Sequence, residues 1–96
     1  MRYYKFPHRR DPRDMMRELI PCIYYLALED DGLTRQRMLV YEDGEVFKYD
    51  EQHRQDAHDR LQLEYIPLRM RHILDWQEIS CEDFDAAWIA HAATNR

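Results

Sequence analysis

Gly32 and Gly44 are the only glycines in this 96-residue chain, and each follows an aspartate between two runs of β-forming residues. Glycine adopts the positive φ values that tight turns need, and an Asp-Gly pair between such runs is a strong hairpin signal. The sequence therefore predicts three successive antiparallel strands over residues 22–28, 34–41 and 45–49. In the middle run, apolar and polar residues fall on both faces, so the pattern leaves open which face points inward.

Two elements outside these runs extend the predicted fold. Residues 2–6 alternate in the manner of a strand, and we expect them to pair within the same sheet. Near the C-terminus, Ser80 precedes Glu82 and Asp83, which is typical of a helix start because a serine side chain accepts a first-turn amide. The spacing that follows predicts a helix with one stripe facing the sheet, formed by Phe84, Ala87, Trp88 and His91.

The remaining segments give weaker patterns. Residues 11–20 are compatible with a short helix or an ordered loop, and residues 51–62 with a polar surface helix or an insertion. After Pro67, the apolar side chains of residues 68–76 predict a further short helix. The sequence as a whole predicts an α+β fold in a single domain, residues 1–96. An antiparallel meander of three or four strands is packed on one face by the C-terminal helix, with short additional helices.

Composition narrows the class of protein. Hydrophobic residues make up 45% of the chain, which favours a folded domain over intrinsic disorder. No apolar run approaches the length of about 20 residues that a membrane span needs, and the N-terminus lacks the apolar core of a secretory signal. Cys22 and Cys81 lie far apart and outside any Cys-x-x-Cys spacing, so a disulfide framework is not indicated. We therefore expect a cytoplasmic protein with no membrane partner.

Charge is distributed unevenly, and this distribution suggests the kind of partner. The chain carries a net charge of -5, yet residues 1–17 hold six basic residues against two acidic ones. Acidic residues gather at the predicted turns, where they would repel nucleic acid and attract a basic protein surface. The predicted partner-binding residues are Asp30, Asp31, Glu42, Asp43 and Glu45. Because consecutive hairpin turns lie at opposite ends of a meander, these five residues are expected to form two separate patches. Only one of the two patches needs to contact the partner.

Catalytic chemistry finds little support in the sequence. The five histidines lack metal-ligand spacing, and His53 and His58 fall on different sides of a helix. A nuclease site would use Asp43, Glu45 and Lys48, but Glu45 and Lys48 point to opposite faces of a strand. A nucleophilic Cys81 has no partner in a recognisable local pattern. We therefore predict no catalytic, cofactor-binding or metal-binding residues and a protein that is not an enzyme, with a cysteine- or histidine-based enzyme as a remaining alternative.

The order of motifs resembles a family of small, uncharacterised bacterial domains. The matching features are the Arg-Tyr-Tyr-Lys strand at residues 2–5, the two Asp-Gly turns, the Ile66-Pro67 pair and the helix start at residues 78–88. The resemblance implies a stand-alone immunity protein that neutralises a co-encoded toxin. The alternative is a small regulator or phage-type inhibitor that contacts nucleic acid through its basic N-terminal arm, with Arg9, Arg10, Arg13 and Arg17.

Overall fold

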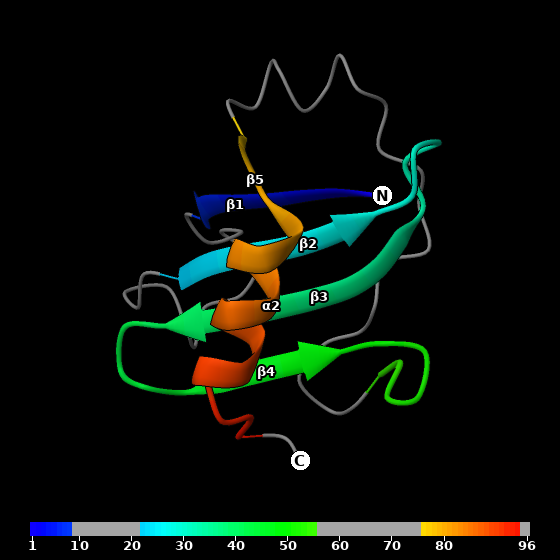
Figure 1. Cartoon of the computed structure of the whole chain (residues 1–96). Helices are drawn as coiled ribbons and strands as arrows, with labels where there is room; N and C mark the ends of the chain where they lie inside the picture. Colours follow the sequence, from blue (N-terminus) through cyan, green and yellow to red (C-terminus); the bar gives the residue numbers. More distant parts are fainter. Residues whose placement is uncertain (9–21, 56–75, 95–96) are drawn as a thin grey trace.

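The computed structural model describes residues 1–8, 22–55 and 76–94, and these form one antiparallel sheet with a helix on one face (Figure 1). The strands are β1 (Arg2–His8), β2 (Cys22–Leu28), β3 (Thr34–Tyr41), β4 (Val46–Tyr49) and β5 (Gln77–Ile79), in the spatial order β4-β3-β2-β1-β5. The helix α2 (Cys81–Ala90) follows β5 directly. The predicted α+β class is confirmed, and so is the four-stranded meander from β1 to β4.

Both predicted hairpins form around their glycines. Gly32 has a φ of 100°, and its amide donates to the carbonyl of Glu29 at 2.8 Å. Gly44 has a φ of 96° and donates to the Tyr41 carbonyl at 3.0 Å. The Tyr41 amide in turn donates to the Glu45 carbonyl at 2.9 Å, so Glu45 closes the hairpin and β4 begins one residue later than predicted.

The strand β5 is an addition that the sequence did not predict. Its three residues pair with Tyr3, Tyr4 and Lys5 on the outer edge of β1. The segment Gln77–Ile79 contains a single apolar residue, which is too short a pattern to reveal the two-residue period of a strand. The predicted helix at residues 68–76 lies outside the described residues except for Trp76, which precedes β5 and is not helical.

Residues 50–55 also differ from the prediction of a helix beginning near residue 51. Asp50 and His53 form an isolated bridge around a turn. The Asp50 carboxylate accepts the amides of Gln52 and His53 at 3.0 Å and 2.9 Å. An aspartate side chain that bonds the backbone two and three residues ahead favours a turn over a helix interior. The rest of that predicted helix, and the segment 11–20, lie outside the described residues.

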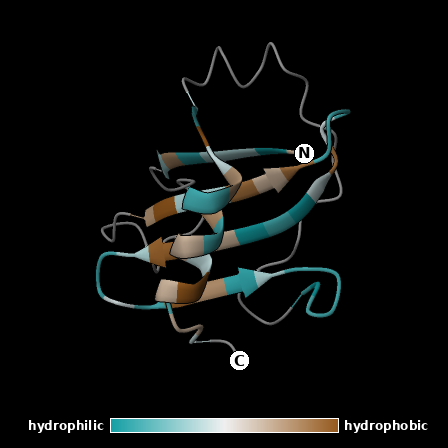
Figure 2. Cartoon of the chain, viewed as in Figure 1, coloured by the Kyte–Doolittle hydropathy of each residue, from teal (hydrophilic) through white to brown (hydrophobic). Residues whose placement is uncertain are grey.

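The helix α2 begins as the sequence predicts and crosses the strands on one face of the sheet (Figure 1). The Ser80 hydroxyl accepts the Asp83 amide at 3.0 Å. Of the predicted stripe, Phe84 is fully buried against Tyr3, with ring centroids 5.1 Å apart. Trp88 and His91 are half-buried. Figure 2 shows hydrophilic residues in the first turn of α2 and in both hairpin turns.

Strand alternation gives the sheet two different faces. The face away from α2 holds two apolar clusters. The first consists of Cys22, Leu39, Tyr41, Phe47 and Tyr49. The second consists of Tyr4, Leu26 and Leu28. It also buries the Arg37 guanidinium, which donates to the Tyr24 hydroxyl at 3.2 Å and lies 5.0 Å from the centre of that ring. The other face packs against α2 in part and carries the candidate site. Among the described residues, no helix is long and apolar enough to cross a membrane.

Candidate functional site

The five predicted partner-binding residues lie at opposite ends of the sheet. Asp30 and Asp31 belong to the β2–β3 turn, and the other three, Glu42, Asp43 and Glu45, belong to the β3–β4 turn (Figure 1). Antiparallel strands of seven and eight residues separate the two turns. The structure therefore divides the predicted residues into two patches, as the topology of a meander requires.

Most carboxylates at the β2–β3 end have a positively charged neighbour. Arg35 donates to Glu29 at 3.0 Å and to Glu51 at 2.5 Å. These contacts raise the pKa of Arg35, with the hydrogen bond to Glu29 as the largest cause. The N-terminal ammonium lies 3.4 Å from Asp30. Much of the negative charge at this end is therefore locally compensated, which weakens its attraction for a distant basic surface.

At the β3–β4 turn, two of the three predicted residues are exposed and the third, Glu45, is half-buried. Glu42 and Asp43 are exposed, and within the part of the chain that the structure describes neither forms an ion pair. Asp43 also stabilises its own turn, because its carboxylate accepts the Glu45 amide at 3.1 Å. Within the described ranges 1–8, 22–55 and 76–94, the Glu42 side chain forms no comparable hydrogen bond. The two patches thus differ in whether their carboxylates have ion-pair partners among the described residues, which the sequence did not indicate.

Next to this turn, a row of apolar side chains remains accessible on the face that carries α2. Pro7 pairs with Ile23, Ile23 with Val40 and Val40 with Val46 across four strands. Pro7 is exposed, Ile23 is 43% exposed and Val40 is half-buried. Val46, in contrast, is buried and bonded to Thr94 through both its amide and its carbonyl. We call Pro7, Ile23 and Val40 the open row.

The width of one helix explains why this row is open. Successive rows on one face of a sheet are two residues apart, or about 7 Å, whereas a helix is about 10 Å wide. α2 covers the two neighbouring rows through three contacts: Phe84 with Tyr3, Trp88 with Lys48 and His91 with Tyr25. Met38 and Ala27, in those rows, have no exposed surface. The third row lies beyond the reach of the helix.

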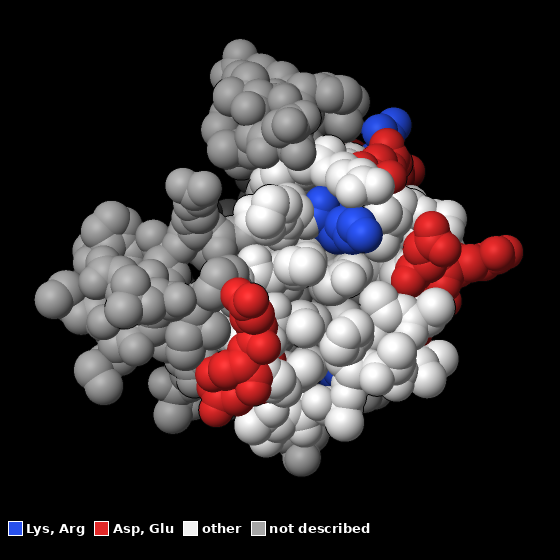
Figure 3. Space-filling view, turned by 90° about the vertical axis from the view of Figure 1, so that its left-hand side faces the viewer, with Lys and Arg blue, Asp and Glu red and all other residues white. Residues whose placement is uncertain are grey.

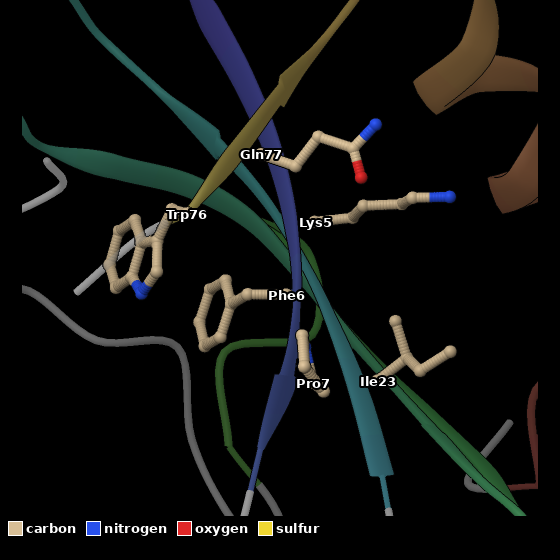
Figure 4. A pocket seen from close by; sticks show the side chains of 6 residues that line it. All are labelled: Lys5, Phe6, Pro7, Ile23, Trp76 and Gln77. Atoms are coloured by element: carbon tan, nitrogen blue, oxygen red, sulfur yellow. The ribbon is translucent and has the colours of Figure 1, made fainter.

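A pocket lies at the β1 end of the open row. Its volume is about 560 Å³, and its lining residues are Lys5, Phe6, Pro7, Ile23, Trp76 and Gln77 (Figure 4). Phe6 and Trp76 stack with ring centroids 4.3 Å apart and planes within 2°. Figure 4 shows these rings on one side of β1, with Lys5, Gln77 and Ile23 on the other. The pocket therefore wraps around the sheet edge and combines apolar walls with a polar rim.

The space-filling view from this end shows acidic areas at the lower left and at the right (Figure 3). Most of the surface between them is uncharged, with one basic patch near its centre. One area belongs to the β3–β4 turn and the other to α2, whose exposed acidic residues are Glu82, Asp83 and Asp85. The helix has acidic residues in its first turn and no basic residue in its last. An apolar centre with a charged rim is the general arrangement of a protein–protein interface.

Lys48 and Cys81, two residues considered for catalysis, contact α2 or lie within it. Lys48 is buried, and its ammonium donates to the Trp88 carbonyl and lies 5.1 Å from the centre of the Trp88 ring. It therefore packs under α2 and is directed away from Asp43. Cys81 is an exposed thiol whose sulfur lies 3.6 Å from a carboxylate oxygen of Asp85. In residues 1–8, 22–55 and 76–94, no group of three or more His, Cys, Asp or Glu side chains is placed to hold a metal ion.

Cys81 also affects a neighbouring tyrosine. A hydrogen bond with Cys81, together with burial and the nearby Asp85 charge, raises the pKa of Tyr3 to about 12. The contact joins the start of α2 to β1.

Comparison with known proteins gives no independent assignment. No family model, no curated protein and no solved structure matches the chain. The suggested membership in a family of small bacterial domains therefore stays a prediction from the motifs. The basic arm of the nucleic-acid alternative, at residues 9–17, lies outside the described residues.

The open row itself was missed by sequence reasoning. All seven residues of β2 are apolar or aromatic, so their alternation does not distinguish an accessible Ile23 from a buried Leu26. The signal that was present is the length of the strands. Strands of seven or eight residues are longer than the width of one helix that crosses them, about 10 Å, so a single helix covers only part of the face.

Proposed function

We propose that this protein is an immunity protein that binds a cognate bacterial toxin or effector domain and masks its active site. The observation that carries the proposal is the open row beside the β3–β4 turn, where accessible apolar side chains adjoin the exposed residues Glu42 and Asp43. The proposed partner has a basic surface, and no cofactor takes part.

Physical chemistry links these features to inhibition. A toxin that acts on nucleic acid must present a positively charged cleft to the phosphate backbone. Carboxylates that lack local counterions steer a protein toward such a cleft and accelerate association. Buried apolar and aromatic contacts then slow dissociation. The same surface that attracts the toxin thereby covers the cleft that the toxin needs.

The proposal places the protein in the cytoplasm, where a toxin acting on nucleic acid meets its target. Neither Cys22 nor Cys81 is in a disulfide, which is compatible with a reducing compartment. Neither thiol is required for the proposed binding.

The test has two stages and uses the whole chain. Immobilised protein is incubated with an extract of the native strain at low salt, and captured proteins are identified by mass spectrometry. We expect a basic protein that arrests growth when expressed alone and does not arrest growth when this chain is co-expressed. A matched variant, Glu42→Gln with Asp43→Asn, removes two negative charges. The asparagine side chain keeps an oxygen that can accept the Glu45 amide, as the Asp43 carboxylate does. We expect it to capture the partner more slowly.

Two results refute the proposal. One is a captured basic protein whose growth arrest co-expression does not relieve. The other is tight, salt-sensitive binding of the isolated chain to RNA or DNA in a gel-shift assay, which instead supports the nucleic-acid alternative.

A further inference from the structure

We infer that the open row and the pocket at its β1 end form the docking surface for a cationic amphipathic segment of the protein partner. This inference rests on the proposed function and adds which face of the molecule binds and which chemistry it recognises. The segment places apolar side chains on Pro7, Ile23 and Val40. Its Lys and Arg side chains lie toward the carboxylates on either side.

The apolar side chains of the proposed segment would contact the part of the sheet face that α2 leaves uncovered. Ile23 lies at the centre of the open row, between Pro7 and Val40, and 43% of it is exposed. The pocket continues this surface around the edge of β1 to the stacked rings of Phe6 and Trp76. A pocket of about 560 Å³ lies within the range that takes a large side chain or a small ligand. Burial of an apolar side chain there would supply the residence time of the complex.

The basic side chains of the proposed segment would contact the two acidic areas that flank the open row. Glu42 and Asp43 follow Val40 in the chain after a single residue, so the turn adjoins one end of the row. The acidic first turn of α2, with Glu82 and Asp83, lies on the other side of this mostly uncharged surface (Figure 3). Among the described residues that line the pocket, Lys5 is the only charged one. Cationic side chains are therefore favoured at the acidic flanks and disfavoured inside the pocket.

The opposite end of the sheet matches this chemistry less well. There, Arg35 already forms ion pairs with Glu29 and Glu51, and the terminal ammonium lies near Asp30. A cationic segment would have to displace these groups before it gained new contacts. The exposed Ile89 on α2 is a large apolar residue outside the open row, and isolated residues of this kind are common on protein surfaces.

The experiment uses the intact, isotopically labelled chain and a defined probe. The probe is an amphipathic helical peptide of Leu and Lys, compared with a peptide in which every Lys is replaced by Glu. We expect the Leu/Lys peptide to shift backbone amide signals of residues 6, 8, 22–24 and 39–43, and the Leu/Glu peptide to bind at least about tenfold more weakly because like charges repel.

Two pairs of matched variants locate the surface. Ile23→Asp is expected to weaken peptide binding at least about tenfold, and Ile89→Asp, at an even more exposed isoleucine, less than about twofold. Glu42→Gln with Asp43→Asn is expected to reduce the affinity and its salt dependence. The same neutralisation at the other turn, Asp30→Asn with Asp31→Asn, is expected to leave both nearly unchanged.

Three results overturn the inference: equal effects of Ile23→Asp and Ile89→Asp, signal shifts centred on residues 29–33, or a dimer of the free chain that Ile23→Asp dissociates. The third result would make the row an interface between two copies. If the Ile23→Asp variant captures the toxin as well as the unmodified protein does, the surface assignment is wrong and the proposed function still stands. Peptide binding at the row without relief of growth arrest supports the surface assignment and refutes the immunity role.

Discussion

Replacement of Phe84 tests how α2 attaches to the sheet. Phe84 has no exposed surface, and its ring packs 5.1 Å from Tyr3 and 5.9 Å from Trp88. Removal of a fully buried phenylalanine costs about 1.5–3 kcal/mol in lost transfer free energy. The cavity and the lost ring contacts bring the expected cost of Phe84→Ala to about 3–5 kcal/mol.

The neighbouring positions on α2 supply graded comparisons. Trp88 is half-buried, so Trp88→Ala gives up about 100 Å² of buried apolar area, or roughly 2–3 kcal/mol at 25 cal/mol per Å². Ile89 is 82% exposed, and Ile89→Ala should change stability by less than about 0.5 kcal/mol. The predicted order of destabilisation is therefore Phe84, then Trp88, then Ile89.

Urea denaturation followed by circular dichroism measures these differences for the whole chain. Domains of this size have total stabilities of about 5–15 kcal/mol, so Phe84→Ala brings the protein close to unfolding. Phe84→Leu, with an expected cost of about 1–1.5 kcal/mol, keeps the comparison measurable if the alanine variant does not fold. A larger loss for Ile89→Ala than for Phe84→Leu would show that α2 presents a different side to the sheet and would refute the packing described above.

Two further predictions concern the hairpin and the contact between β1 and α2. Gly44→Ala should destabilise the protein by about 1–2 kcal/mol in urea, because φ is 96° and an added Cβ meets nothing within 4 Å, so the cost is purely conformational. Gly44→Asn should cost less stability than Gly44→Ala. Equal stability of the unmodified protein and both variants would contradict the positive φ at residue 44. Because the pKa of Tyr3 is raised from 10.0 to about 12, the stabilisation from this group is complete below pH 10 and is lost as pH rises through about 12. In an NMR titration of labelled tyrosines, with Tyr3→Phe for assignment, Cys81→Ala should lower the Tyr3 pKa, and an unchanged value would contradict the hydrogen bond.

The acidic turns show how far sequence reasoning reaches toward a candidate site. The position of each turn follows from its Asp-Gly pair, and the meander topology places the two turns at opposite ends. The charge state of each end does not follow, because Arg35, Glu29 and Glu51 come together only after the strands pair. Asp43 also carries a structural hydrogen bond, so its carboxylate serves the turn as well as any partner.

Local features of the sequence determined the local features of the fold. Glycines with positive φ terminate strands, and a serine with acidic neighbours begins a helix, since both effects act within four or five residues. These signals alone gave the meander, the start of α2 and the α+β class. Tertiary structure decided what depends on distant partners: the three-residue strand β5 on the edge of β1, Lys48 beneath Trp88, and the exposure of Ile23. Whether an apolar side chain in a uniformly apolar strand is buried depends on what covers it, and α2 is too narrow to cover all three rows of its face.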